Sequence, residues 1–166
     1  TFFPEIIAQE GIDGVCLGEG ELALSELVKN LEQGADLRQV QNWWLKDRGG
    51  IIHKNPVGPL MPDLNLLPFP DRELIREYEY PRPRRFWFFL TGRGCPYNCT
   101  YCFNQPYYEL YKNKGNRIRR LTVDRAIEEI LSVKENFSLD LVNFIDDCFI
   151  VEMGWLEEFA DKYPIR

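Results

Sequence analysis

The first apolar segment of the chain predicts one strand followed by one helix. A short apolar run from Gly14 to Leu17 ends in glycines, and helical spacing of apolar residues follows from about Glu21 to Glu32, with Gly34 placed to end the helix. The stripe expected to be buried consists of Leu22, Leu24, Leu27, Val28 and Leu31. This order is typical of the last part of an α/β unit.

A less regular stretch comes next. Val40 to Trp44, together with Ile51 and Ile52, predicts a hairpin that turns at residues 46–50. Prolines recur from Asn55 to Pro83. Because proline removes backbone donors and favours extended chain, this stretch predicts a linker that contains the domain boundary.

A second apolar series begins at residue 84. Residues 84–94 form an apolar run ended by glycines, which predicts a strand buried on both faces. Residues 122–137 predict a helix capped by Thr122, residues 139–150 a second buried strand, and residues 153–163 another helix. The inner face of the first helix should consist of Ala126, Ile127, Ile130, Leu131 and Val133. Such a βαβα series predicts parallel strands.

Composition narrows the class of protein. Hydrophobic residues make up 45% of the 166 residues, which indicates a globular chain. The net charge of -6 argues against non-specific nucleic-acid binding. Two arginine clusters are most simply solvated surface, or alternatively an anion or substrate entrance: Arg82, Arg84 and Arg85, and Arg117, Arg119 and Arg120.

Location and completeness are also expectations at this point. No run approaches the ~18 apolar residues of a membrane helix, and no signal peptide opens the chain, so a cytoplasmic protein without membrane contact is expected. The sequence enters and leaves in mid-pattern, which suggests a fragment of a longer protein.

Three of the five cysteines lie within one loop, with the spacing Cys95-x3-Cys99-x2-Cys102. An odd count and such local spacing favour a reducing compartment with metal or redox chemistry over disulfides. Three thiolates can bind three irons of a cubane cluster and leave the fourth open, whereas structural zinc needs a fourth ligand. The candidates for that ligand, none at knuckle spacing, are Cys148, Cys16 and His53.

Two adjacent carboxylates, Asp146 and Asp147, follow the second strand of this series. The carboxyl ends of parallel strands are where ligands bind in α/β proteins. Charged carboxylates there are costly unless a cation meets them. Helix capping is the simpler alternative.

The stretch GRGCPYNCTYCFN, residues 92–104, resembles the signature of the radical S-adenosylmethionine superfamily. The resemblance implies that Cys95, Cys99 and Cys102 hold a [4Fe-4S] cluster whose open iron binds S-adenosylmethionine. Reductive cleavage of that cofactor then gives methionine and a 5′-deoxyadenosyl radical, which abstracts hydrogen from the substrate.

The same resemblance assigns further cofactor-binding residues. Tyr101 and Phe103 would lie beside the cluster and adenine, although loop packing is an equal alternative for Tyr101. Asp146 or Asp147 would meet the amino group of S-adenosylmethionine, and only one of them, because alternate side chains point to opposite faces.

Two other stretches resemble the cobalamin-binding subclass of that superfamily. VCLGEGE, residues 15–21, is similar to the end of its cobalamin-binding domain, and LPFPDREL, residues 67–74, to the linker that follows. Gly18 and Gly20 would let the cofactor's nucleotide tail approach closely. The Asp-x-His-x-x-Gly pattern of some members is absent, and His53 reads more simply as an exposed hairpin residue, so whether cobalamin binds is open. Cys16 and Cys148 are best explained as core strand residues.

The resemblance implies an α/β chain in three parts. Residues 1–35 would be the C-terminal part of a Rossmann-like cobalamin-binding domain, residues 36–85 a connector, and residues 86–166 the first βαβα units of a TIM-type barrel. The implied activity is that of a radical S-adenosylmethionine enzyme that performs cobalamin-dependent methylation or related C–H chemistry. A small-molecule substrate and an electron donor such as flavodoxin or ferredoxin would be its partners. The alternatives are an RNA-modifying, methylthiotransferase-like enzyme and a zinc- or iron-binding interaction module.

Overall fold

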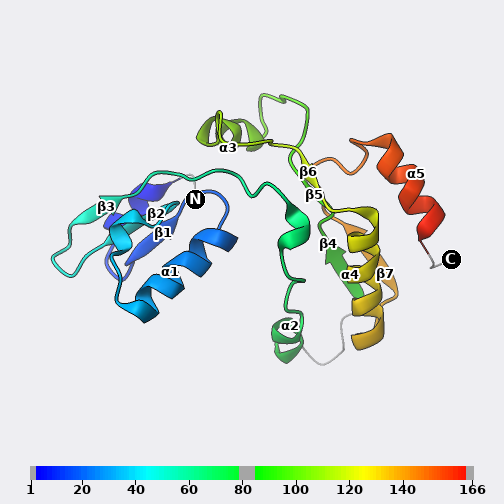
Figure 1. Cartoon of the computed structure of the whole chain (residues 1–166), viewed down its shortest axis with the longest axis horizontal. Coiled ribbons are helices and arrows are strands. Elements are labelled where there is room, and N and C mark those ends of the chain that lie inside the picture. Colours follow the sequence, from blue (N-terminus) through cyan, green and yellow to red (C-terminus); the bar gives the residue numbers. More distant parts are fainter. Residues whose placement is uncertain (1–2, 79–84, 164–166) are drawn as a thin grey trace. The chain divides into compact units, whose positions relative to one another are not determined.

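The computed structural model describes residues 3–78 and 85–163 (Figure 1). It divides into two compact units, each discontinuous in sequence. The first unit comprises residues 1–61 and 98–116, and the second comprises residues 62–97 and 117–166. Arg82 and Arg84 lie outside the described residues.

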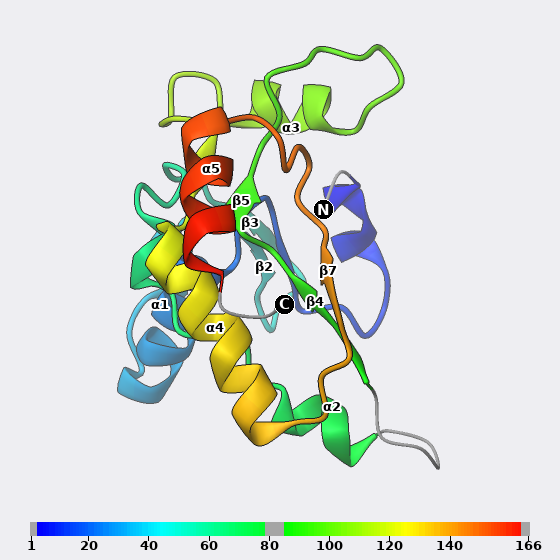
Figure 2. The same cartoon turned by 90° about the vertical axis from the view of Figure 1, so that its right-hand side faces the viewer.

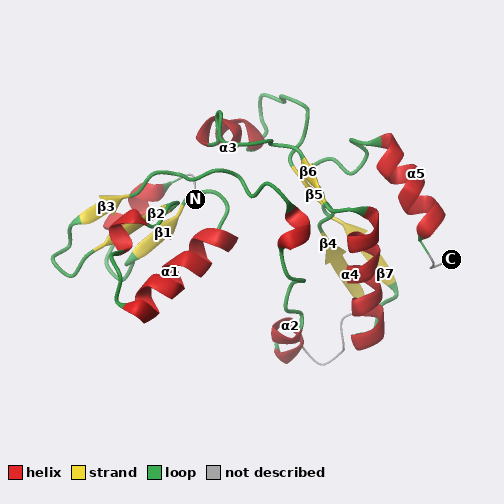
Figure 3. Ribbon diagram, viewed as in Figure 1, coloured by secondary structure: helices red, strands yellow, loops and turns green. Residues whose placement is uncertain are grey.

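The first unit is built on a three-stranded antiparallel sheet in the order β1-β2-β3 (Figure 3). Its strands are β1 (Gly14–Cys16), β2 (Trp43–Lys46) and β3 (Ile52–Lys54). Its helices are η1 (Pro4–Ala8), α1 (Glu21–Gln33), η2 (Leu37–Gln39) and α3 (Asn104–Leu110). A small apolar core includes Ile7, Val15 and Leu17.

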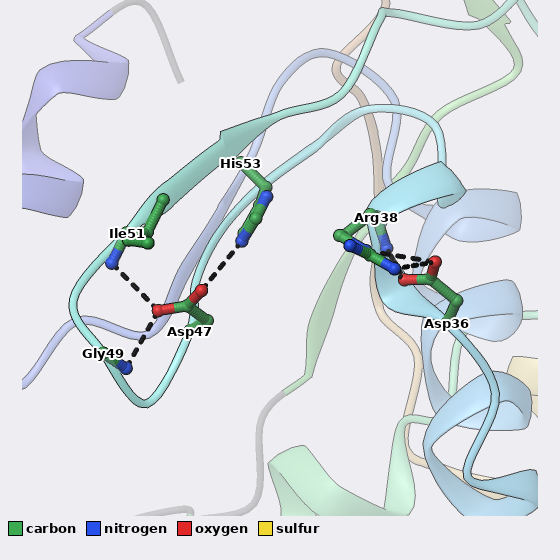
Figure 4. Close-up of polar contacts among 6 residues, drawn as sticks. All are labelled: Asp36, Arg38, Asp47, Gly49, Ile51 and His53. Carbon is green, nitrogen blue, oxygen red and sulfur yellow. Dashed lines mark hydrogen bonds and ion pairs between the residues drawn. The ribbon is translucent and has the colours of Figure 1, made fainter.

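The predicted hairpin is confirmed as β2 and β3. In its turn, the carboxylate of Asp47 accepts the backbone N–H groups of Gly49 and Ile51 at 2.9 Å each and contacts Nε2 of His53 at 3.0 Å (Figure 4). His53 is therefore a partly exposed hairpin residue held by Asp47.

Figure 4 also shows Asp36, whose carboxylate accepts the backbone N–H of Arg38 and caps η2. The hydrogen bond from the Arg38 side chain lowers the pKa of Asp36 to about 2.

The buried stripe predicted for α1 is largely wrong. Leu27 is buried together with Ala23, whose carbonyl accepts a hydrogen bond from Nε1 of Trp43. The other apolar side chains of the expected stripe are exposed: Leu22, Leu24, Val28 and Leu31.

The second unit contains the parallel pair β4 (Phe86–Phe89) and β7 (Leu141–Phe144), which Figure 2 shows side by side. This pairing confirms the prediction of parallel strands. A second pair is antiparallel, β5 (Gly92–Arg93) with β6 (Arg119–Arg120). The helices are η3 (Leu64–Leu66), α2 (Glu73–Glu77), α4 (Val123–Asn136) and α5 (Met153–Lys162).

Burial of the first strand on both faces is not observed. Trp87 and Phe89 are buried, whereas Phe86 and Phe88 on the opposite face are exposed, since the described helices of this unit cover one face. On the covered face, Arg72 and Glu129 form a buried ion pair at 2.6 Å, and the Arg72 guanidinium lies 4.9 Å from the Phe89 ring.

Helix α4 matches its prediction closely. The hydroxyl of Thr122 accepts the N–H of Arg125 and caps the helix. Three of the five positions expected on its inner face, Ala126, Ile130 and Val133, are fully buried.

Within the ranges 3–78 and 85–163, none of the helices has the length and apolar character required to cross a bilayer.

Candidate functional site

Strand β5 leads directly into the cysteine loop through Gly94. Gly94 has φ +91°, and a side chain there would overlap the carbonyl oxygen of Arg117, so both the dihedral and the space require glycine. The N–H of Gly94 donates to Oδ2 of Asp147 at 3.0 Å. One of the paired carboxylates therefore holds the residue that immediately precedes Cys95.

Its neighbour, Asp146, is placed differently. Its Oδ1 accepts the hydroxyl of Thr91 at 2.9 Å, and its Oδ2 is buried without a hydrogen-bond partner among the described residues. Burial raises the pKa of Asp146, and the Thr91 hydrogen bond and the charge of Arg120 only partly oppose this. The two carboxylates thus have distinct environments, although both lie beyond the end of β7 and not within the strand.

Arg120 completes the cluster. The sequence indicated it only as a member of an arginine cluster, without a role of its own. Its Nη2 donates to the carbonyl of Phe149 at 2.7 Å and lies 3.4 Å from the Thr91 hydroxyl, while its guanidinium lies 4.0 Å from the Trp155 ring. Nε and Nη1 are buried without partners in the described part of the chain. Burial lowers the pKa of Arg120. We call Thr91, Arg120 and Asp146 the strand-end cluster.

The three clustered cysteines fall in both units. Cys95 belongs to the second unit and is half-buried, whereas exposed Cys99 and half-buried Cys102 belong to the first. All five cysteines lie within the described residues, and each is a thiol rather than half of a disulfide. No group of three or more His, Cys, Asp or Glu side chains within the described ranges is arranged to hold a metal ion.

The aromatic residues of the loop are open to solvent. Tyr101 is 90% exposed, and Phe103 is 58% exposed. The loop itself turns tightly, because the N–H of Cys102 donates to the carbonyl of Cys99 at 3.0 Å. Both rings present apolar surface to solvent.

The glycine turn of the first unit, Gly18 to Gly20, is in close contact with Tyr111. Gly18 has φ +77°, and a side chain there would overlap the phenol of Tyr111. At Gly20, an added Cβ would meet Sγ of Cys16 at 3.9 Å, and among the described residues beyond its chain neighbours it would meet nothing closer. Tyr111 lies far along the chain from this turn, so no local sequence pattern could have indicated the contact.

The remaining candidates for a fourth metal ligand are accounted for separately. His53 is held by Asp47 in the hairpin. Cys16 is half-buried in β1, and burial raises the pKa of its thiol, as expected of a core cysteine. Cys148 is also half-buried.

Comparisons with known proteins extend these observations. A scan against protein-family models finds no match. An uncharacterised methyltransferase of Pyrococcus horikoshii is 32% identical over 152 residues, which cover 90% of this chain and 32% of that protein. Cytidylyl-2-hydroxyethylphosphonate methyltransferase of Streptomyces wedmorensis is 23% identical, covering 95% of the chain and 34% of that protein. The chain thus spans about a third of the length of these relatives.

A solved structure agrees with the sequence relatives. The apo form of OxsB, a cobalamin-dependent S-adenosylmethionine radical enzyme, matches 84% of the chain and 18% of its own length, with a TM-score of 0.60 and 25% identity. Its form with aqua-cobalamin and S-adenosylmethionine bound matches 96% of the chain and 22% of its own length, with a TM-score of 0.69 and 22% identity. Together with the cysteine motif, these likenesses show that the chain belongs to the radical S-adenosylmethionine superfamily, in the subclass whose members contain a cobalamin-binding domain.

Proposed function

We propose that this chain supplies the cluster-binding loop and part of the S-adenosylmethionine site of a radical enzyme that performs cobalamin-dependent methylation or related C–H chemistry. The observation that carries the proposal is the hydrogen bond from Gly94 to Asp147. It joins the start of the cysteine loop to the carboxylate pair that follows β7. Both features therefore meet at the carboxyl end of a parallel strand pair, where α/β proteins bind ligands.

Cys95, Cys99 and Cys102 would hold a [4Fe-4S] cluster with one open iron. Their chemistry fits that group, because all three are thiols and none is sealed inside the core. When bound, the cluster supplies the electron that cleaves S-adenosylmethionine to a 5′-deoxyadenosyl radical. Asp147 would fix the start of the loop through Gly94, and a flavodoxin or ferredoxin would be the electron donor.

Asp146 is our candidate for the amino group of S-adenosylmethionine. Its Oδ2 is a buried acceptor without a partner among the described residues, so an ammonium would satisfy it. Asp147 already accepts from Gly94, which makes it the weaker candidate of the pair. Tyr101 and Phe103 offer exposed rings against which the adenine could stack.

Cobalamin would approach the glycine turn of the first unit. Gly20 leaves its backbone open, whereas the space at Gly18 is taken by Tyr111, so Gly20 is the stronger of the two candidates. We place residues 1–35 at the end of a Rossmann-like cobalamin-binding domain, residues 36–85 in a connector, and residues 86–166 at the start of a TIM-type barrel. The substrate would be a small molecule, since methyltransferases acting on small molecules are among the relatives.

Matched cysteine variants test the cluster assignment. Iron and sulfide are supplied anaerobically to the wild-type chain, to Cys99→Ala and to Cys148→Ala, and bound iron is measured. We expect Cys99→Ala to lose the cluster and Cys148→Ala to retain it, because only the former belongs to the three-cysteine loop. Loss of metal from Cys148→Ala, with tight zinc binding by the wild type, would instead indicate a closed four-ligand site.

A further inference from the structure

We propose that Tyr111 is a positioning residue that fixes the segment following the cysteine loop to the glycine turn. Its phenol would thereby control the order of the turn that carries Cys99 and Cys102. Everything on which this inference rests lies within the first unit. We call Tyr111, Gly18, Glu19 and Asn42 the Tyr111 network.

At one end, the phenol oxygen is held by the glycine turn. The N–H of Glu19 donates to it at 2.6 Å, and Nδ2 of Asn42 donates to it at 3.3 Å. Tyr111 is only 4% exposed, and Gly18 allows its close approach. Burial raises the pKa of Tyr111, so the phenol stays protonated at neutral pH.

At the other end, helix α3 connects Tyr111 to the cysteines. The helix begins at Asn104, two residues after Cys102, and Tyr111 is its C-cap. The side-chain amide of Gln105 donates to the carbonyl oxygens of Asn98 and Cys99 at 2.9 and 3.1 Å. This short helix is thus hydrogen-bonded to the Cys99 turn at its start, through Gln105, and to the glycine turn at its end, through Tyr111.

A second attachment holds the segment after α3, so the effect of removing the phenol hydroxyl can be measured without unfolding the unit. The backbone N–H of Leu60 donates to the carbonyl of Lys114 at 2.8 Å, and Nζ of Lys114 donates to the carbonyl of Val57 at 2.5 Å. These bonds hold the chain beyond α3 to the same unit without the phenol. Removing the hydroxyl should therefore loosen α3 and the Cys99 turn and leave the sheet folded.

The contact also links two ligands, a consequence that rests on the proposed function. If cobalamin binds at the glycine turn, it acts on the residues that hold Tyr111. Any effect of that ligand on the order of the Cys99 turn must be matched by an equal effect of the ordered turn on cobalamin affinity. Tyr111 would then couple the cobalamin segment to the cluster segment.

Amide hydrogen exchange of Tyr111→Phe tests the positioning role in the ligand-free chain. The matched control is Tyr78→Phe, which removes a hydroxyl from a side chain that is 82% exposed. We expect exchange of residues 17–20 and 99–111 to rise about tenfold in Tyr111→Phe, because the two hydrogen bonds that the phenol accepts from Glu19 and Asn42 are lost. The hairpin of β2 and β3 should keep its protection, and Tyr78→Phe should match the wild type.

Gly18→Ala, whose added methyl group would overlap the phenol of Tyr111, should give the same exchange pattern. Unchanged exchange at residues 99–111 in both variants would overturn the proposal, as would an equal rise throughout the first unit. Aqua-cobalamin is then added to the wild type. If it leaves exchange unchanged while the tenfold difference persists without ligand, the role of Tyr111 is supported and cobalamin binding is contradicted.

Discussion

The Tyr111 network in the first unit and the strand-end cluster in the second both contain buried polar atoms, but they differ in how far the hydrogen bonds of those atoms are satisfied. Asn42 donates to the Glu19 carbonyl and the Tyr111 phenol and accepts from the N–H of Gly58 at 2.6 Å. In the strand-end cluster, by contrast, one carboxylate oxygen of Asp146 and two guanidinium nitrogens of Arg120 have no hydrogen-bond partner among the described residues.

This difference separates a structural role from a ligand-binding one. A satisfied buried network stabilises the fold, whereas unsatisfied buried charges reduce stability and persist where function requires them. Satisfied hydrogen bonds should therefore make residues of the Tyr111 network costly to replace. Residues of the strand-end cluster should be replaceable without loss of stability but with loss of binding.

The largest expected effect is that of Asn42→Ala. The change removes three hydrogen bonds at a residue that is 5% exposed, so we expect the free energy of unfolding to fall by about 2–4 kcal/mol. Urea unfolding followed by tryptophan fluorescence measures it. Asn113→Ala is the matched control: Asn113 also has positive φ but is exposed, so only the smaller backbone effect should remain. Equal losses in the two variants would show that the buried bonds contribute nothing.

Asp146→Asn should have the opposite signature. Asparagine can still accept from Thr91, and it removes a buried charge, so stability at neutral pH should be unchanged or higher by up to about 1 kcal/mol. Affinity for S-adenosylmethionine, measured by calorimetry on the cluster-loaded chain, should fall about ten- to a hundredfold with the loss of a charge-assisted hydrogen bond. Asp140→Asn, at an exposed ion pair with Arg85, is the control. Lost stability with unchanged affinity would make Asp146 structural.

The same variant has a smaller, pH-dependent effect. The pKa of Asp146 is raised in the folded state, so the folded chain binds more protons than the unfolded one. Stability from this group is present below its unfolded pKa of about 3.9 and is lost as pH rises through its folded pKa. The wild type should therefore lose stability relative to Asp146→Asn as pH is raised from about 4 to 7. A difference that is constant with pH would contradict the buried-charge account.

Local features of this fold could be predicted from the sequence. Thr122 indicates the start of α4, because its side chain caps the helix. The glycines that follow the 86–89 strand indicate where the cysteine loop begins. Adjacent Asp146 and Asp147 also lie just after a strand, β7, as their position in the sequence predicted. Each of these signals is carried by residues close together in the chain.

Features that depend on distant residues could not be predicted. Tyr111 meets Glu19 across 92 positions of sequence, and the burial of Arg120 depends on Trp155 and Phe149. The apolar pattern also predicted burial that is not observed, at Leu22 in the first unit and at Phe88 in the second. The pattern says only which residues share a face. It does not say whether another element covers that face.

The most direct test of the proposed function is EPR of the reduced, anaerobically reconstituted chain with and without S-adenosylmethionine. We predict a [4Fe-4S] signal in the absence of the cofactor and a changed signal in its presence, because three cysteines leave one iron open to bind it. A signal that is identical with and without the cofactor would contradict the open iron. Tight zinc binding with no cluster would contradict the radical-enzyme account as a whole.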